Sequence, residues 1–138
     1  GGAFVFTRPT VASTTWSLTG FLKAPNPGIG DNFGGSVRID GDLLLLTASF
    51  EDGSGRGVNP ASDEAATDSG AMYLFRRSGN TFVLHSYLKP SNTDPGDSFR
   101  SVGLTQGLIV GASRFEDGNG TDSADNSVVD SGAFYVYE

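Results

Sequence analysis

The 138-residue chain contains no cysteine, one histidine and no long hydrophobic run. Without cysteine it can form no disulfide and no thiolate-ligated metal site. Without an apolar stretch of about 18 residues, it has no segment that we expect to span a membrane. Basic residues are also scarce, because nine Lys and Arg stand against 16 Asp and Glu. The net charge of −7 excludes nucleic acid as an expected partner, since a phosphate backbone attracts basic surfaces, and it favours cations or neutral polymers.

The residues that are abundant indicate a β-protein. Twenty glycines and six prolines separate short runs of Val, Leu, Phe and Tyr, a pattern typical of strands joined by turns. No window of about eleven residues shows the 3.6-residue period of an amphipathic helix. The chain starts with Gly1-Gly2 and not with methionine, so we expect a processed chain or a part of a longer one.

Most of the sequence occurs nearly twice. The segment D-N-F-G-G-S-V that starts at Asp31 returns as D-S-F-R-S-V at Asp97. Three shorter pairs are L-K at Leu22 and Leu88, F-E-D-G at Phe50 and Phe115, and D-S-G-A at Asp68 and Asp130. The Gly-Ala-aromatic part of the last segment occurs a third time, as Gly2-Ala3-Phe4. Repeats of this length predict a stacked or radial β-architecture.

These motifs resemble the FG-GAP repeat, the blade of integrin-α-like β-propellers, and most closely its bacterial-type subgroup. The Phe-Gly pair is Phe33-Gly34, and the Gly-Ala-Pro site of the second copy is G-A-S at Gly111. The resemblance covers almost the whole chain. Two departures are Phe99-Arg100, which lacks the glycine, and T-A-S at Thr47 in place of Gly-Ala-Pro. The family's calcium loop lies between the strand with the Phe-Gly pair and the strand with the Gly-Ala-Pro site. This chain has only short turns there, so that calcium site is not carried over.

The repeat and the resemblance together predict an all-β fold of tandem four-stranded antiparallel propeller-like blades. About two repeat units are present, too few to close a propeller within one chain. We expect residues 1–24 to form a hairpin of the third and fourth strands of a blade, residues 25–89 a complete blade, and residues 90–138 a partial blade that lacks its fourth strand. The complete blade has its first, second and fourth strands predicted at 33–39, 43–48 and 82–89, and its third after Asp68.

Acidic side chains gather in two long loops, each between the second and third strands of a unit. Alternating oxygen-bearing side chains are a pattern that a hard cation such as Ca²⁺ can use. The candidate ligands are Asp117, Asn119, Thr121, Asp122 and Asp125 in the second loop, and Asp52, Ser54 and Asp63 in the first. The alternative is that these residues form Asx-turns in solvated loops and bind no metal. Asp68 and Asp130 are expected to accept backbone N–H bonds at the start of the third strand.

Other chemical signals in the sequence are sparse. We expect no enzyme, because the only histidine, His85, lies on an outer strand and no nucleophile motif is present. Nothing singles out two acids for glycoside hydrolysis. The sequence N-G-T at Asn119 matches a glycosylation sequon, with a chance match as the alternative. The aromatic side chains of the fourth strands either pack between blades or form a platform for a sugar or a protein; they are Trp16, Phe21, Phe82 and Tyr87.

The incomplete units predict how the chain functions. Uncovered blade faces and unpaired strand edges are states that natural proteins avoid. Our first hypothesis is an extracellular structural protein that self-assembles head to tail, as a filament or ring, through blade stacking and strand complementation. The assembly residues are Gly2, Ala3, Phe4, Val5, Phe6, Trp16 and Phe21 on the donor side and Phe134 and Tyr135 on the acceptor side. The alternative is an integrin-like adhesion or ligand-binding module of a larger cell-surface protein, with an extracellular protein or glycan as partner and Ca²⁺ as a candidate cofactor.

Overall fold

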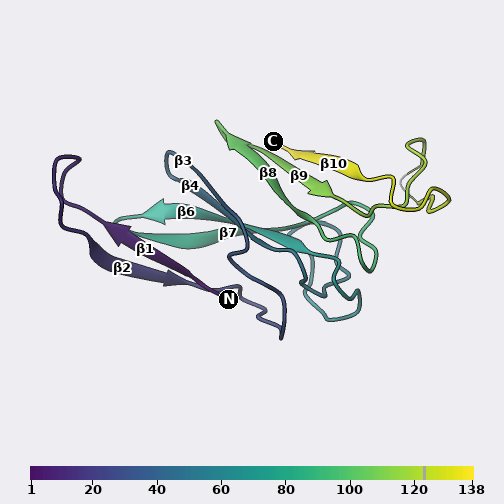
Figure 1. Ribbon diagram of the computed structural model, residues 1–138, viewed down its shortest axis with the longest axis horizontal. Coiled ribbons are helices and arrows are strands. Elements are labelled where there is room, and N and C mark those ends of the chain that lie inside the picture. The colour runs from purple at the N-terminus through teal and green to yellow at the C-terminus, as the bar shows by residue number, and fades with distance from the viewer. Residues whose placement is uncertain (123) are drawn as a thin grey trace.

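Residues 1–122 and 124–138, which the computed structural model describes, contain ten β-strands and no helix. The strands are β1 (Ala3–Thr7), β2 (Ser17–Leu22), β3 (Val37–Asp40), β4 (Leu43–Ala48), β5 (Gly57–Val58), β6 (Ala71–Ser78), β7 (Thr81–Lys89), β8 (Arg100–Thr105), β9 (Leu108–Ser113) and β10 (Ala133–Tyr137). Every pairing is antiparallel. The strands form three sheets that do not close into a propeller (Figure 1), so the predicted all-β class is confirmed.

The middle sheet has the strand order β3-β4-β6-β7-β5. Its strand β4 reads L-L-L-L-T-A and is buried almost throughout, as expected of a strand covered on both faces. The sequence predicts the first strand from Phe33, but β3 begins only at Val37. The reason is the backbone before it, since Asn32 (φ 58°) and Gly34 (φ 89°) adopt left-handed conformations that an extended strand does not contain. The two-residue strand β5, which pairs with the end of β7, has no signal in the sequence.

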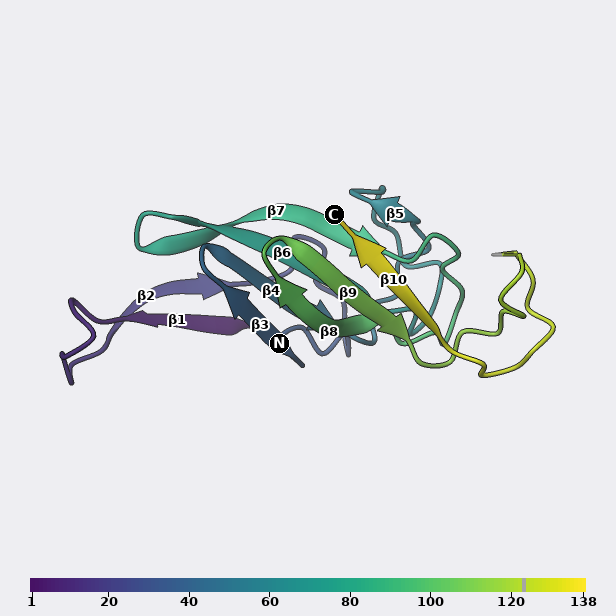
Figure 2. The same ribbon diagram turned by 90° about the horizontal axis from the view of Figure 1, so that it is seen from above.

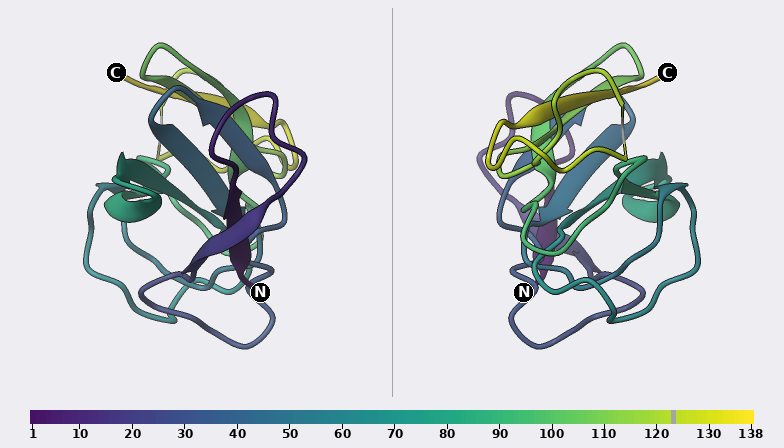
Figure 3. Two further views of the ribbon diagram at one scale, coloured as in Figure 1. Left: turned by 90° about the vertical axis from the view of Figure 1, so that its left-hand side faces the viewer. Right: turned by 90° about the vertical axis from the view of Figure 1, so that its right-hand side faces the viewer.

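A smaller sheet lies on each side of the middle one. Strands β1 and β2 form a hairpin, and the C-terminal sheet has the order β10-β9-β8. In the described residues β10 is paired along one edge only, with β9. The hairpin and the long loop before β10 lie at opposite ends of the long axis (Figure 2). The two chain termini lie on opposite sides of the molecule (Figure 3).

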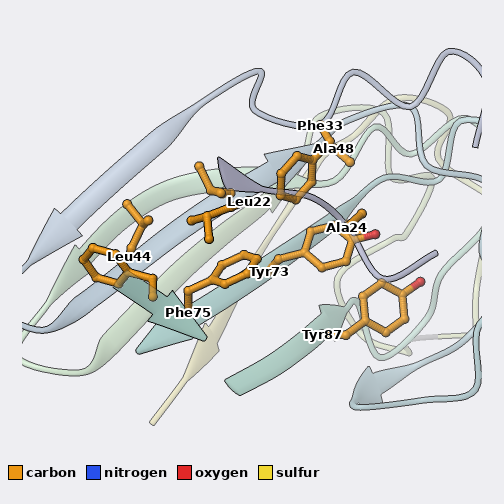
Figure 4. Packing of buried hydrophobic residues seen from close by; sticks show 11 residues of the cluster. Leu22, Ala24, Phe33, Leu44, Ala48, Tyr73, Phe75 and Tyr87 are labelled. Atoms are coloured by element: carbon orange, nitrogen blue, oxygen red, sulfur yellow. The ribbon is translucent and has the colours of Figure 1, made fainter. Parts of the chain in front are cut away.

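Two apolar cores hold the three sheets together. Successive side chains of a strand point to opposite faces, so Tyr73 and Phe75 of β6 enter one core, and Met72 and Leu74 enter the other. The first core, which we call the hairpin core, joins the middle sheet to the β1–β2 hairpin, and Figure 4 shows how its side chains pack. It consists of Leu22, Ala24, Phe33, Leu44, Leu46, Ala48, Ala71, Tyr73, Phe75, Phe82 and Tyr87. The second core joins the middle sheet to the C-terminal sheet through residues that include Phe99 and Ile109.

The hairpin repeats the register of the middle sheet. Phe4 of β1 lies opposite Phe21 of β2, as Tyr73 lies opposite Tyr87, and both pairs are followed by a bulge at the same place. This register makes Ala3 the counterpart of Met72. The sequence favours a different alignment, of Gly2-Ala3-Phe4 with Gly-Ala-Met, which is shifted by one residue and makes Ala3 the counterpart of Ala71. A shift of one residue moves every side chain to the other face. Accordingly Ala3 packs against the hairpin core, while Phe4 is exposed.

Candidate functional site

A buried lysine closes one end of the middle sheet. Lys89 ends β7, and its ammonium nitrogen Nζ donates to the Glu51 Oε2 atom (2.8 Å), to the Ser69 hydroxyl oxygen (2.7 Å) and to the Gly70 carbonyl oxygen (2.7 Å). Both members of the Lys89–Glu51 ion pair are almost fully buried. An ammonium has three donors, so each one is satisfied. We call this arrangement the lysine lock.

The carboxylate of Glu51 is held by further donors. Tyr87 donates its hydroxyl to the Oε1 atom (2.7 Å), Asn26 donates its amide to the same atom (2.7 Å), and the Gly53 backbone N–H donates to Oε2 (3.1 Å). Burial lowers the pKa of Lys89, and the neighbouring Glu51 carboxylate opposes that shift. Burial also raises the pKa of Tyr87, so this hydroxyl keeps its proton and remains a donor. The lock is a fully paired polar network in an apolar setting, which is the condition under which a buried charge is tolerated.

The C-terminal sheet contains the same acceptor group. Glu116 is the counterpart of Glu51 and has 2% of its surface exposed. Asn92 donates its amide to the Glu116 Oε1 atom (2.5 Å), as Asn26 does to Glu51, and the Tyr135 hydroxyl lies 2.9 Å from Oε2. The Ser131 hydroxyl lies 3.1 Å from the Glu116 carbonyl oxygen, which matches the 3.0 Å between Ser69 and Glu51.

The cation of the lock is missing from this second group. In the described part of the chain no Lys, Arg or His forms an ion pair with Glu116; the two ion pairs recorded are Lys89–Glu51 and Arg77–Asp42. Burial raises the pKa of the Glu116 carboxyl, as expected when charge is desolvated without an opposite charge. We call Glu116 with the Ser131 hydroxyl and the Gly132 carbonyl the open lock.

A cavity of about 490 Å³ adjoins the open lock. Its walls come from the start of the loop after β7, from the long acidic loop and from the start of β10. The lining residues are Ser91, Asn92, Glu116, Gly118, Asn119, Gly120, Thr121, Asp122, Ser131, Gly132, Ala133 and Tyr135. Polar groups that converge on a concave site can orient a ligand, and the carboxylates of Glu116 and Asp122 on this wall can only accept hydrogen bonds when ionised.

The edge and one face of β10 are uncovered next to this cavity. Phe134 is 73% exposed and Val136 is 60% exposed. Their counterparts in the middle sheet are Met72 and Leu74, which are buried in the second core. The C-terminal sheet therefore presents apolar side chains on the face with which the middle sheet packs against its neighbour.

Several of the predicted cation ligands form hydrogen bonds within turns. In the second loop, Asn119, Asp122 and Asp125 each accept the backbone N–H of a residue two positions later, which is the Asx-turn pattern. Asp125 also accepts from the Asn119 amide, and Thr121 donates its hydroxyl to Asn119. The described residues contain no group of three or more His, Cys, Asp or Glu arranged to hold a metal. Calcium binding stays a prediction, with Asn119, Thr121 and Asp122 on the cavity wall.

The other acids near these loops have local roles. Asp63 accepts from the backbone N–H and the hydroxyl of Ser54, both at 2.7 Å, and these bonds lower the pKa of Asp63. Asp52 and Asp117 accept the backbone N–H groups of Asp68 and Asp130, both at 2.8 Å. The sequence predicts that Asp68 and Asp130 accept backbone N–H bonds, and the Asp68 carbonyl oxygen does accept the Ser98 N–H group (3.0 Å). Both residues have a left-handed backbone (φ 55° and 54°).

The predicted aromatic set divides in two. Phe82 and Tyr87 are buried in the hairpin core, so packing explains them. Trp16 and Phe21 are exposed on the hairpin, where the Arg8 guanidinium lies 4.8 Å from the centroid of the Trp16 ring. Their exposure is compatible with a contact surface.

Sequence reasoning missed the lysine lock. Two repeats in the sequence contain its residues. They are L-K, which ends in Lys23 and Lys89, and F-E-D-G, which contains Glu51 and Glu116. The signal that could have indicated a buried ion pair has two parts. A lysine is repeated at the end of one apolar strand, and an acid is repeated after another apolar strand.

Residues 16–75 match the model of the FG-GAP repeat. No curated protein and no solved structure matches the chain. The matched repeat is typical of secreted and cell-surface proteins. In the part of the chain that the structure describes, no helix has the length and apolarity that a membrane crossing requires.

Proposed function

We propose that this chain, which contains an FG-GAP repeat at residues 16–75, is an extracellular structural module that assembles head to tail with further copies of itself. In this arrangement the C-terminal sheet of one copy joins the hairpin end of the next, through strand complementation and blade stacking. The partner is the same chain, and neither nucleic acid nor a membrane span is part of the proposal.

The observation that carries the proposal is the uncovered C-terminal sheet. Phe134 and Val136 lie exposed beside the unpaired edge of β10, whereas the same positions of the middle sheet are buried by a neighbouring sheet. Burying apolar surface contributes about 25 cal/mol per Å², and an unpaired edge can accept another strand. A further sheet at this face would repeat a contact that the molecule already makes internally.

The hairpin side offers a matching surface. Phe4, Phe6, Leu18 and Phe21 are all exposed there. The two surfaces lie on different sheets, so the contact is heterologous, and such contacts generate a ring when the rotation closes and a filament when it does not.

The test is electron microscopy of the purified chain and of a variant that lacks residues 1–23. We expect rings or filaments from the intact chain and separate particles from the truncated one, with circular dichroism verifying that the truncated chain retains its strands. Val11→Ser, at an exposed turn of the hairpin tip, is the matched control and should assemble as the intact chain does. Normal assembly of the truncated chain would contradict the proposal.

A second candidate function is that of an adhesion or ligand-binding module of a larger surface protein. The observation that favours it is the cavity of about 490 Å³, whose wall includes Glu116 and three predicted cation ligands. Calorimetric titration with Ca²⁺ tests it. Binding heat that is lost in Asp122→Asn and kept in Asp63→Asn would support a cation at the cavity, and an absence of heat would remove the calcium component.

A further inference from the structure

Lys23 on the hairpin is the counterpart of the lysine that closes the lock. The residues Tyr87-Leu88-Lys89 of β7 correspond to Phe21-Leu22-Lys23. The shared register makes Gly1 the counterpart of Gly70. The hydrogen bonds agree with this assignment. Lys23 donates from Nζ to the Gly1 carbonyl oxygen (2.5 Å), as Lys89 does to the Gly70 carbonyl oxygen (2.7 Å).

The two lysines differ in what surrounds them. Lys89 is fully buried and has a carboxylate and a hydroxyl as further partners. Lys23 is exposed, and the ion pairs recorded in the described residues do not include it. The same molecule thus holds an ammonium with one lock bond made and, in the open lock, a buried acceptor group to which no ammonium of the described residues donates.

We propose that the open lock of Glu116, Ser131 and Gly132 binds the Lys23 ammonium of a second copy of the chain. Strand β10 of the first copy then pairs with β2 of the second copy and takes the position that β1 occupies in the single chain. This inference rests on the proposed self-assembly and names the contact that directs it.

The geometry of β1 fits a strand that can be replaced. By register, Tyr135 of β10 corresponds to Tyr73 and therefore to Phe4 of β1. Phe134 and Val136 then correspond to Ala3 and Val5, the two β1 residues that pack partly buried against the hairpin core. The incoming strand would place Phe134 where β1 has the smaller Ala3, and Val136 where β1 has the identical Val5.

The space for the larger side chains is present. A second cavity, of about 200 Å³, lies between β1 and the middle sheet. It is lined by Ala3, Phe4, Val5, Phe6, Val37, Ile39, Leu44, Leu46 and Phe82. This cavity opens to solvent, since Phe4, Phe6, Val37 and Ile39 on its wall are exposed, and it leaves room beside Ala3 for a larger side chain. Phe134 of a second copy is larger than Ala3 and would fill more of it.

Electrostatics favour the same partner. A buried carboxylate without a counter-charge is costly, and an ammonium from the partner would remove that cost. The probe for this step is a synthetic peptide of residues 16–24 labelled with fluorescein, with norleucine in place of Lys23 in the matched control peptide. Norleucine keeps an unbranched apolar side chain and removes the charge. Because the change is made in the peptide, the protein itself stays unaltered.

Fluorescence anisotropy measures binding of both peptides to the full chain, kept at a concentration below assembly. We expect the lysine peptide to bind at least tenfold more tightly than the norleucine peptide. Glu116→Gln should abolish that difference, whereas Asp122→Asn, which removes an acid from the same cavity wall, should leave it within about twofold. Equal affinity of the two peptides for the full chain would overturn the inference.

Assembly of the full chain separates this inference from the proposed function. Lys23→Met and Glu116→Gln should each reduce the assembled mass measured by light scattering at least tenfold, and the charge reversal Lys23→Glu with Glu116→Lys should restore part of it. If the intact chain assembles and neither single variant reduces the mass, the lysine contact is wrong and self-assembly stands. If the intact chain stays monomeric while the lysine peptide binds through Glu116, the site stands and a second copy as its occupant is overturned.

Discussion

The lysine lock and the open lock are two copies of one polar group in two states of completion. In the middle sheet, Glu51 is paired with Lys89 from the fourth strand of the same sheet. In the C-terminal sheet, Glu116 has neutral donors from Asn92 and Tyr135 and no fourth strand beside it in the described residues. The comparison shows that the loop carries the acceptors and the outer strand carries the cation. In the middle sheet the strand that carries the lysine, β7, therefore completes the polar group of the loop as well as the strand pairing.

The largest expected effect comes from breaking the complete lock. Lys89→Met leaves the Glu51 carboxylate buried without its cation, and removing one partner of a buried ion pair costs about 3–5 kcal/mol. Urea denaturation measures the free energy of unfolding. Lys23→Met is the matched control on the exposed counterpart and should change it by less than about 0.5 kcal/mol. Equal losses from the two variants would mean that the locks do not differ as described.

A second test uses pH to probe the C-terminal sheet. Burial raises the pKa of Asp97 from 3.8 to about 7. The folded protein then holds this proton more tightly than the unfolded chain, so the contribution of Asp97 to stability falls as the pH rises from about 4 to about 7. Asp97→Asn removes that loss and keeps an acceptor for the Asp94 N–H group. Relative to wild type, the melting temperature of this variant should rise across the window.

Asp63 provides the control of opposite sign. Hydrogen bonds from Ser54 lower its pKa below 3.8, so its charged form favours the folded state, and that contribution is lost as the pH falls through the folded pKa. Asp63→Asn should therefore lose stability relative to wild type above about pH 4. A melting temperature for Asp97→Asn that runs parallel to wild type from pH 4 to pH 8 would contradict the burial of a charged Asp97.

Two tyrosines sharpen the comparison further. The hydroxyl of Tyr135 contacts both Asn92 and the unpaired Glu116, whereas the hydroxyl of Tyr73 bonds Asn26. Leaving a buried polar group unsatisfied costs about 1–3 kcal/mol. We expect Tyr135→Phe to lose more unfolding free energy than Tyr73→Phe, because Glu116 has fewer donors in reserve than Glu51. Calorimetric unfolding of both variants decides this, and a larger loss for Tyr73→Phe would argue against it.

The smallest effect is expected at the exposed ion pair. Arg77 and Asp42 lie 3.0 Å apart, with side chains that are 35% and 72% exposed, and such pairs contribute about 0.2–1 kcal/mol. Asp42→Asn should therefore change the urea midpoint only slightly, and 0.5 M NaCl should remove most of the difference. A change as large as that of Lys89→Met would show that burial does not set the strength of these pairs.

The sequence predicts strands well where apolar runs are bounded by turns. Strand β4 occupies residues 43–48 as expected, and the third strand follows Asp68, since β6 begins at Ala71 directly after the left-handed Gly70 (φ 81°). The register of β1 could not be predicted, since Gly1 and Gly2 leave two alignments of similar quality, and only the observed pairing with β2 distinguishes them. The lock could not be predicted either, because pairing between Glu51 and Lys89 joins residues 38 positions apart.

The measurement that tests the account most directly is amide hydrogen exchange of β10 as the concentration of the intact chain increases. If β2 of a second copy pairs with this edge, peptides that cover residues 133–137 should gain protection with concentration, while those from β4, which already has a partner on each side, should not change. Lys23→Met should move the gain to higher concentration. Exchange of β10 that is the same at every concentration would show that its edge is not where the copies meet.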